Sequence, residues 1–209
     1  MDFSFLSLRP QDGADERHPV LGTDIHAEPA DGQEVIYLAA GCFWGVEKAM
    51  WEQPGVIATA TGYMGGLADA DHPTYRQVCT GRTDHAETVR VVYDPERLPT
   101  SQLLAAFFEM HDPTQGDRQG NDIGTQYRSA IWTTTPEQAA TAQATLDGYQ
   151  QVLTADGFPA ITTEVATADD AGTFWYAEPE HQAYLWHHPD GYQCHARTGR
   201  ACPVVPAGR

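Results

Sequence analysis

The order of the patterned segments between residues 34 and 167 is the feature that most constrains the fold. Short apolar runs typical of strands alternate with amphipathic stretches of helical period, in the order strand, helix, strand, strand, helix, strand, helix, strand. This order is a split βαβ unit with an appended helix and strand. It predicts an α+β fold with a ferredoxin-like mixed sheet and helices on one face of that sheet.

The pattern also sets the expected bounds of these segments. We expect strands at Glu34–Ala40, 56–66, 85–95, 127–134 and 161–167, and helices at 45–55, 100–113 and 136–157. In the second helix Leu103, Leu104, Phe107 and Phe108 share one face, which should pack on the sheet. The third helix begins at a capping box, Thr135-Pro136-Glu137-Gln138, with proline at the first helical position.

The 209 residues suit one folded domain with two less regular ends. Residues 1–33 are polar, with scattered Pro, Gly and Asp, and are expected to form an irregular N-terminal extension. The folded domain should span 34–190. After about Gly172 the chain loses its periodicity, which predicts a long coil-rich C-terminal segment that ends in a mobile tail at 191–209.

Charge and hydropathy exclude several classes of protein. The net charge is −17, from 29 acidic and 12 basic residues, which disfavours a nucleic-acid partner and an anionic membrane surface. We find no apolar stretch long enough to span a membrane. The N-terminus lacks the basic start and apolar core of a secretory signal, so we expect a cytoplasmic protein with reduced thiols.

The cysteines and histidines do not predict a disulfide scaffold, a metal or a cofactor. Four cysteines in 209 residues are too few for a stapled fold, and their spacings lack a paired-ligand signature. His181, His187 and His188 are close in sequence, but the adjacent pair cannot easily share a face with His181. We therefore expect no metal, and a role for His181 in bracing a loop through hydrogen bonds.

Cys42 has the most informative position of the four cysteines. In "GCFWG" (41–45) it stands where a strand passes into a helix, and unpaired N–H groups at such a turn should lower the pKa of its thiol. Phe43 and Trp44 then place at least one ring beside the sulfur. The competing interpretation is a small buried apolar residue, which is what most free cysteines are.

The "GCFWG" segment resembles the signature of the A-class peptide methionine sulfoxide reductases. Further segments follow in that family's order and spacing: "GYMGG", "PTYRQVCTG", "HAETVRVVYDP", "LLAAFFEMHDPTQGDRQGNDIGTQYRSAIW" and "YAEPEHQAYL". The resemblance covers about residues 34–192. It implies that Cys42 attacks the sulfur of methionine (S)-sulfoxide, free or in peptides, and that Phe43 and Trp44 form an apolar cup for its methyl group.

The resemblance also assigns polar partners to that reaction. It implies that Glu87, in "HAET", is a protonated acid that donates to the sulfoxide oxygen, which requires an apolar site that raises its pKa. Tyr75 and Tyr127 match phenols that hydrogen-bond this oxygen, and Asp122 matches a substrate-binding carboxylate. Without the motifs these four would be a solvated glutamate, two core tyrosines and a turn residue.

The tail cysteines complete the implied reaction. By resemblance to three-cysteine members, Cys194 resolves the sulfenic acid on Cys42, Cys202 then attacks Cys194, and thioredoxin reduces the resulting disulfide of a monomeric enzyme. The stretch "CHARTGRAC" holds only Gly199, where the family usually has several glycines. We expect the basic groups of the tail, His195, Arg197, Arg200 and Arg209, to lower the pKa of the recycling thiols. Cys79 is assigned to the core.

Three other functions fit parts of the pattern. A cysteine hydrolase or acyl transferase could use His85 and Asp122 beside Cys42, but the tail cysteines would have no role. A non-enzymatic binding module would need only the Phe43–Trp44 cup. A peroxide-reducing thiol enzyme would need a threonine and an arginine around the thiolate, and none is arranged near Cys42 in the sequence.

Overall fold

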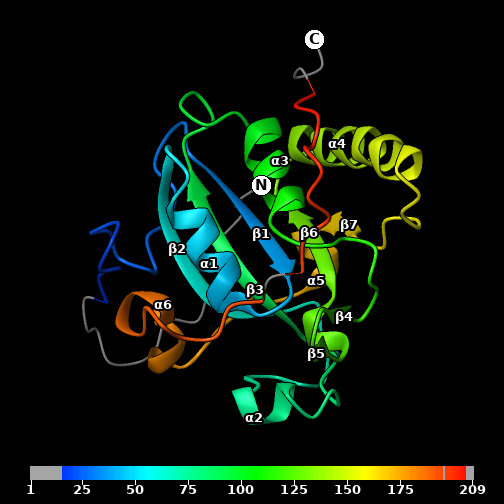
Figure 1. Cartoon of the computed structure of the whole chain (residues 1–209). Coiled ribbons are helices and arrows are strands. Elements are labelled where there is room, and N and C mark those ends of the chain that lie inside the picture. The colour runs from blue at the N-terminus through cyan, green and yellow to red at the C-terminus, as the bar shows by residue number, and fades with distance from the viewer. Residues whose placement is uncertain (1–15, 195, 206–209) are drawn as a thin grey trace.

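A six-stranded mixed sheet forms the centre of the protein. The computed structural model describes residues 16–194 and 196–205, and Figure 1 shows the whole chain. The strand order is β7-β6-β1-β3-β2-β8, and every neighbouring pair is antiparallel except β6 and β7. The strands are β1 (Glu34–Ala40), β2 (Val56–Met64), β3 (Ala86–Tyr93), β6 (Ser129–Thr133), β7 (Glu164–Thr167) and β8 (Trp175–Tyr176).

The inner strands have the split βαβ arrangement. The chain runs from β1 through helix α1 (Phe43–Trp51) to β2, and β3 then inserts between these two parallel strands. Helix α3 (Thr100–Glu109) connects β3 to β6 on the other side of β1. This confirms the predicted α+β class and the mixed sheet. It also sets the end of β1, and therefore Cys42, beside the start of β3.

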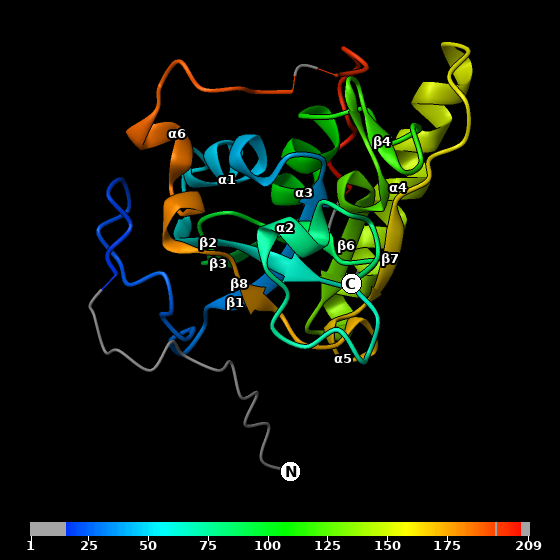
Figure 2. The ribbon, with the colours of Figure 1, turned by 90° about the horizontal axis from the view of Figure 1, so that it is seen from below.

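Three helices cover one face of the sheet. Figure 2 shows α1 and α3 on the same side, with α4 (Pro136–Ala155) beyond them over β6 and β7. Leu103, Leu104, Phe107 and Phe108 of α3 are fully buried, as the pattern predicts. Burying four such side chains favours folding by roughly 1.5–3 kcal/mol each before conformational entropy is subtracted.

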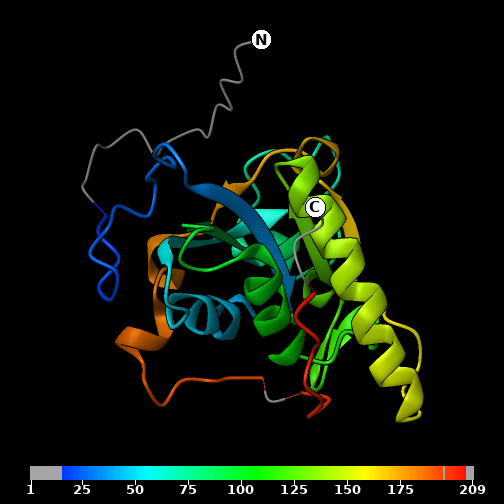
Figure 3. The ribbon, with the colours of Figure 1, turned by 90° about the horizontal axis from the view of Figure 1, so that it is seen from above.

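Irregular chain covers the opposite face, as Figure 3 shows for the segment that precedes β1. Ala27 packs near Val35, Ala58 and Val92, and the segment after β7, with α5 (Ala168–Ala171), brings Phe174 against the sheet. All eight residues of β3 are therefore buried. The larger helices lie on one face as expected, but both faces of the sheet are closed.

Several short elements surround one end of the sheet. They are α2 (Tyr75–Val78), β4 (Arg118–Gln119), β5 (Asp122–Ile123), η1 (Thr125–Tyr127), η2 (Pro179–His181) and α6 (Tyr184–His187). Each spans four residues or fewer, which is too short for a hydrophobic period to reveal. The predicted sequence of eight elements contains none of them.

The predicted start of α4 is confirmed, with one difference in the cap. Thr135 accepts the Gln138 N–H at 3.1 Å. The Gln138 side chain does not return to Thr135, but accepts the Thr134 N–H at 2.8 Å. The reciprocal half of the capping box is thus moved by one residue, while Pro136 occupies the first helical position as expected.

The two ends of the chain pack on the domain where they are described. In the N-terminal part His18 and Ile25 are buried, and residues 1–15 of the predicted extension lie outside the described residues. In the C-terminal part Thr198 contacts the Tyr149 hydroxyl of α4, and Cys202 N–H donates to Glu109 of α3 at 2.8 Å. Figure 1 shows this segment beside α3 and α4. The mobility expected for 191–209 stays a prediction.

Candidate active site

Cys42 lies at the junction of β1 and α1 and is the N-cap residue of the helix. The junction needs glycine before it. Gly41 has φ +90°, and a Cβ there would lie 2.7 Å from Cγ of Gln119. The backbone therefore turns sharply against the buried Gln119 side chain and delivers Cys42 to the site.

Glu87 reaches the same junction from β3. It shares a strand face with Val89 and Val91, which point toward the helices, and it is 1% exposed. Its Oε2 accepts the Phe43 N–H at 3.0 Å. Tyr63 of β2 lies directly opposite in the register and closes the pocket around the carboxyl group.

Glu87 has the protonation state expected of an acid. Burial raises its pKa to about 8, and the nearby charge of Asp122 acts in the same direction. The hydrogen bond from Phe43 N–H favours the ionised form, but it is the weaker effect. Glu87 therefore carries its proton at neutral pH. Its place in the alternation of β3 puts it on the buried face of the strand, which provides the apolar surroundings.

The thiol of Cys42 differs from our expectation. Burial raises its pKa well above the ordinary value, and the Glu87 carboxylate raises it further. The Trp44 and Gly45 N–H groups lower it, as expected for a helix N-terminus, but burial outweighs them. The expectation of a depressed pKa is wrong for this state. Because Glu87 is one of the causes, protonation of Glu87 favours ionisation of Cys42.

An aromatic group surrounds the two residues after Cys42. The Phe43 ring is fully buried and lies 5.8 Å from the Tyr63 ring and 6.5 Å from the Tyr75 ring, between centroids. The Trp44 ring is half-buried and stacks on Tyr184 at 3.8 Å. The two rings thus point differently, and Trp44 is the one that reaches the surface.

Glu178, which the sequence did not single out, and His181 hold this group together. Glu178 accepts the Tyr63 hydroxyl through Oε2 and the Tyr75 N–H through Oε1, both at 2.8 Å. His181 accepts the Trp44 indole N–H on Nδ1 at 3.3 Å, which confirms the expected bracing role. Both belong to "YAEPEHQAYL", so their presence in that segment was the available signal.

Asp122 of β5 and Tyr127 of η1 lie near Cys42 as well. The pKa of the Tyr127 phenol is raised by burial and by the charges of Glu87 and Asp122, which places these groups together. Asp122 also contributes to the raised pKa of Cys42. Its carboxyl oxygens both lie 3.0 Å from the hydroxyl of Tyr192, a tail residue not predicted for the site.

Cys194 lies in the same region as Cys42. Both line a cavity of about 30 Å³, together with Gln119, Gln193 and Arg197. A cavity of that size holds about one water molecule. The Cys194 thiol donates to the Gln119 carbonyl at 3.4 Å. The structure therefore brings the thiols of Cys42 and Cys194 to one small cavity.

Cys202 and Cys79 lie differently from expectation. Cys202 is 6% exposed in the main core, and burial and Glu109 raise its pKa to about 12. The expected lowering by tail cations is thus wrong for Cys202, and Arg200 pairs with Asp156 instead. His195 and Arg209 lie outside the described residues. Cys79 is exposed, so its assignment to the core is also wrong.

The described residues, 16–194 and 196–205, contain neither a candidate metal site nor a candidate membrane span. No group of three or more His, Cys, Asp and Glu side chains there could hold a metal ion. No described helix combines the length and the apolar character needed to cross a bilayer. All four cysteines are free thiols in this structure.

Comparison with known proteins decides the family. The model of the family described as peptide methionine sulfoxide reductase matches residues 34–204. The chain belongs to this family. "Peptide methionine sulfoxide reductase MsrA" of Vibrio cholerae serotype O1 is 50% identical over 189 residues, which cover 90% of this chain and 87% of that protein.

Solved structures agree with the assignment. Methionine sulfoxide reductase A of Corynebacterium diphtheriae has a TM-score of 0.79 and 46% identity, over 92% of this chain and 91% of that one. Mxr1 from Saccharomyces cerevisiae in complex with Trx2 has a TM-score of 0.53 and 19% identity, over 82% and 95%. The last likeness shows the shared fold alone. The family membership confirms the resemblance found in the sequence.

The structure of this reductase gathers most of the predicted site. Cys42, Phe43, Trp44, Tyr75, Glu87, Asp122, Tyr127 and Cys194 converge on the end of β1. Cys202 does not join them, because it is held in the core between α3 and α4. Eight of the predicted residues thus lie together, and Cys202 lies apart from them in the core.

Proposed function

We propose that this methionine sulfoxide reductase acts on the S epimer, in peptides and free, through nucleophilic attack by Cys42. The observation that carries this proposal is the Glu87–Phe43 contact of 3.0 Å, which holds a protonated carboxyl group beside the junction that carries the thiol. A sulfoxide needs both a nucleophile for its sulfur and a proton for its oxygen.

The first step transfers two electrons from Cys42 to the substrate sulfur. The Cys42 sulfur bonds to the sulfoxide sulfur and Glu87 protonates the sulfoxide oxygen. The S–O bond then breaks, the hydroxyl group bonds to the Cys42 sulfur, and the bond between the Cys42 sulfur and the methionine sulfur breaks. Methionine leaves and Cys42 becomes a sulfenic acid. The thiol proton of Cys42 balances the step by restoring Glu87. Burial is the largest cause of the raised pKa of Cys42, so the thiol gives up its proton as it attacks and not before.

The neighbouring side chains bind and orient the substrate. The hydroxyls of Tyr75 and Tyr127 hydrogen-bond the sulfoxide oxygen, since both phenols interact with Glu87. Phe43 and Trp44 form the cup for the methyl group, with the half-buried Trp44 ring as its outer wall. Asp122 binds the polar part of the substrate from the β5 side.

The tail returns Cys42 to its starting state. The Cys194 thiol attacks the Cys42 sulfenic acid, a Cys42–Cys194 disulfide forms and water leaves. The Cys202 thiol then attacks Cys194, which releases Cys42 as a thiol and leaves a Cys194–Cys202 disulfide. A thioredoxin dithiol reduces that disulfide and becomes oxidised. The shared Cys42–Cys194 cavity supports the first exchange.

The wider setting follows from this thiol chemistry. The cycle uses no cofactor, because all electrons pass through cysteine sulfur. We propose that the enzyme works as a monomer in the cytoplasm, where thioredoxin and free thiols stay reduced. It would there repair oxidised methionine. Sedimentation velocity at micromolar concentration tests the oligomeric state, and a dimer would contradict it.

The proposed reaction is tested with separated epimers of methionine sulfoxide. Thioredoxin-coupled turnover is measured for wild type and Cys42→Ser. We expect turnover of the S epimer alone, lost in Cys42→Ser. Turnover that survives Cys42→Ser would contradict the assignment of the nucleophile.

A further inference from the structure

A second carboxyl group is buried near the active site and has no role in the chemistry proposed above. Glu47 lies on α1, one turn after Phe43, and is 0% exposed. Burial raises its pKa to about 8. A carboxyl group is costly to bury unless each oxygen has a partner, so its contacts should explain why it is there.

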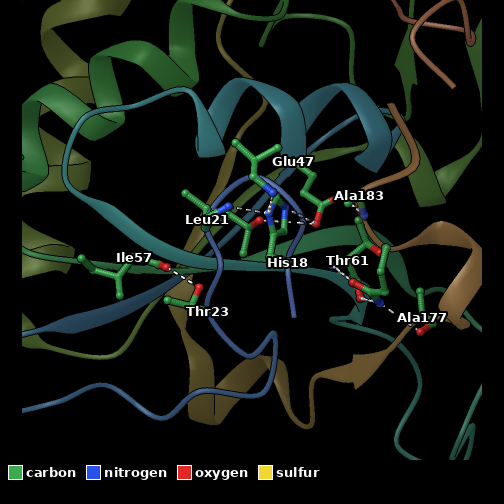
Figure 4. A network of polar contacts seen from close by, with 11 residues as sticks. His18, Leu21, Thr23, Glu47, Ile57, Thr61, Ala177 and Ala183 are labelled. Carbon is green, nitrogen blue, oxygen red and sulfur yellow. Dashed lines mark hydrogen bonds and ion pairs between the residues drawn. The ribbon is translucent and has the colours of Figure 1, made fainter. Parts of the chain in front are cut away.

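Glu47 joins α1 to two segments that are far away in the sequence, as Figure 4 shows. Its Oε2 accepts the Ala183 N–H at 2.9 Å, and its Oε1 accepts the Thr59 hydroxyl at 3.4 Å. The Nε2 atom of His18, from the N-terminal segment, lies 3.7 Å from Oε1. One side chain therefore contacts β2, the segment before α6 and the N-terminal segment.

The tautomer of His18 follows from its other contacts. Its Nδ1 accepts the backbone N–H groups of Val20 and Leu21, both at 3.2 Å, so it carries no proton. Burial lowers the pKa of His18 to about 4, so the ring is neutral and its proton is on Nε2, facing Glu47. Thr23 also donates to Ile57 of β2 at 2.6 Å, which fixes the segment beside Glu47.

The contact with Ala183 leads directly to the substrate cup. Ala183 has φ +49°, a left-handed conformation that costs energy in an alanine and needs support from its surroundings. The next residue, Tyr184, stacks on Trp44 at 3.8 Å between ring centroids. Gln182, on the other side of Ala183, accepts the Thr61 N–H at 2.9 Å and holds the segment to β2.

We propose that Glu47 is a positioning residue for substrate binding. It holds the left-handed turn at Ala183 through the 2.9 Å hydrogen bond, and through that turn it holds Tyr184 against Trp44. His18 closes the far side of Glu47, which makes the segment around residues 18–23 part of the active-site framework. The inference rests on the proposed role of Trp44 in the cup.

The test compares Glu47→Leu with Glu47→Gln and with Glu52→Leu. Gln keeps a carbonyl oxygen for the Ala183 N–H, Leu removes it, and Glu52 is an exposed glutamate at the C-cap of the same helix. With a chemical dithiol as reductant, we expect Glu47→Leu to raise KM for methionine sulfoxide about tenfold, the effect of one lost buried hydrogen bond, with kcat nearly unchanged. Glu47→Gln and Glu52→Leu should keep the wild-type KM.

A second measurement does not depend on activity. Amide hydrogen exchange of the peptide containing Ala183 should be faster by about tenfold or more in Glu47→Leu, and unchanged in Glu47→Gln. Unchanged exchange in Glu47→Leu would overturn the proposal, and so would faster exchange with a wild-type KM. If Cys42→Ser retained turnover while both expectations here were met, the proposed chemistry would fail and the positioning role would stand.

If Glu47→Leu does not fold, Glu47→Asp replaces it in the test. The aspartate side chain keeps a carboxyl group but is one methylene shorter, so the group lies farther from the Ala183 N–H. The same rise in KM and the same faster exchange are expected. A wild-type KM in Glu47→Asp, with wild-type exchange at Ala183, would then overturn the proposal.

Discussion

Glu87 accepts the Phe43 N–H at 3.0 Å, so the proposed acid is hydrogen-bonded to the residue next to the proposed nucleophile. The contact ties β3 to the first turn of α1. It places the carboxyl group at Cys42 without using a charged partner, and burial then keeps the carboxyl protonated at neutral pH. Position and protonation thus come from the same two elements.

Replacement of Glu87 by Gln should slow the reduction step and leave the fold intact. Gln keeps an oxygen for the Phe43 N–H but cannot donate a proton of comparable acidity. Loss of a general acid costs about 10²–10⁴-fold in rate. The single-turnover rate of methionine formation is the measurement. Wild type should slow as the pH rises through about 8, where Glu87 loses its proton, and the variant should lack this decrease.

Glu96→Gln is the matched control for that variant, because Glu96 is an exposed glutamate in the loop after β3. It should have the wild-type rate and pH profile. A single-turnover rate of Glu87→Gln within threefold of the wild-type rate would show that another group donates the proton.

The same carboxyl group should make stability depend on pH. Between about pH 4.5 and about pH 8 folded Glu87 holds a proton that the unfolded chain has released, so the free energy of unfolding falls as pH rises through this window. The contribution is fully present below about pH 4.5. The free energy of unfolding of Glu87→Gln, relative to that of wild type, should therefore increase by on the order of a few kcal/mol between pH 5 and pH 8.

Urea unfolding of both proteins at pH 5 and pH 8 measures that difference. Glu47 has a pKa raised to about 8 as well and adds a slope of the same sign to both proteins, which cancels in the comparison. If the free energy of unfolding changed equally in wild type and variant between pH 5 and pH 8, Glu87 would be ionised in the folded state at neutral pH.

Tyr192→Phe should slow resolution of the sulfenic acid without affecting its formation. Tyr192 lies two residues before Cys194. Its hydroxyl hydrogen-bonds Asp122 and so anchors the tail beside the cavity that Cys42 and Cys194 line. A hydrogen bond to a carboxylate is worth about 1.5–3 kcal/mol, so closure of the Cys42–Cys194 disulfide should slow about tenfold or more. Quenched-flow thiol counting separates the two steps. Slower methionine formation with normal disulfide closure would contradict this role.

The thiols should differ strongly in their access to a modifying reagent. Cys79 is exposed and Cys194 partly buried, whereas Cys42 and Cys202 are buried with raised pKa values. We expect N-ethylmaleimide to label Cys79 first, then Cys194, and Cys202 much more slowly. Peptide mass spectrometry gives the order. Rapid labelling of Cys202 in the reduced enzyme would show that the tail leaves the core before any disulfide forms.

The regular part of the fold could be predicted because long segments carry their own signal. β1 has the predicted bounds, Glu34–Ala40, since an apolar run bounded by polar residues and Gly41 leaves little choice. The α3 face and the start of α4 were equally readable from period and capping. The short elements, such as α2 and β5, depend on contacts with distant residues, and no local period encodes them.

The site was predictable through motifs and less so through physical chemistry. Residue identities in the segments pointed to Cys42 and Glu87, but the pKa of Cys42 depends on how deeply the junction is buried, which a sequence does not state. Glu178 and Tyr192 were missed because their roles exist only through partners more than 60 residues away. The core position of Cys202 depends on tertiary contacts as well, so its sequence alone predicts a mobile tail thiol.

The most direct test of the central claim is the product of one turnover on Cys42. Cys194→Ser removes the resolving thiol, so one equivalent of methionine (S)-sulfoxide should give one equivalent of methionine and leave one added oxygen atom on the Cys42 peptide, measured by mass spectrometry after trapping of the sulfenic acid. Methionine formed with Cys42 unmodified, or with the oxygen on another cysteine, would contradict the account.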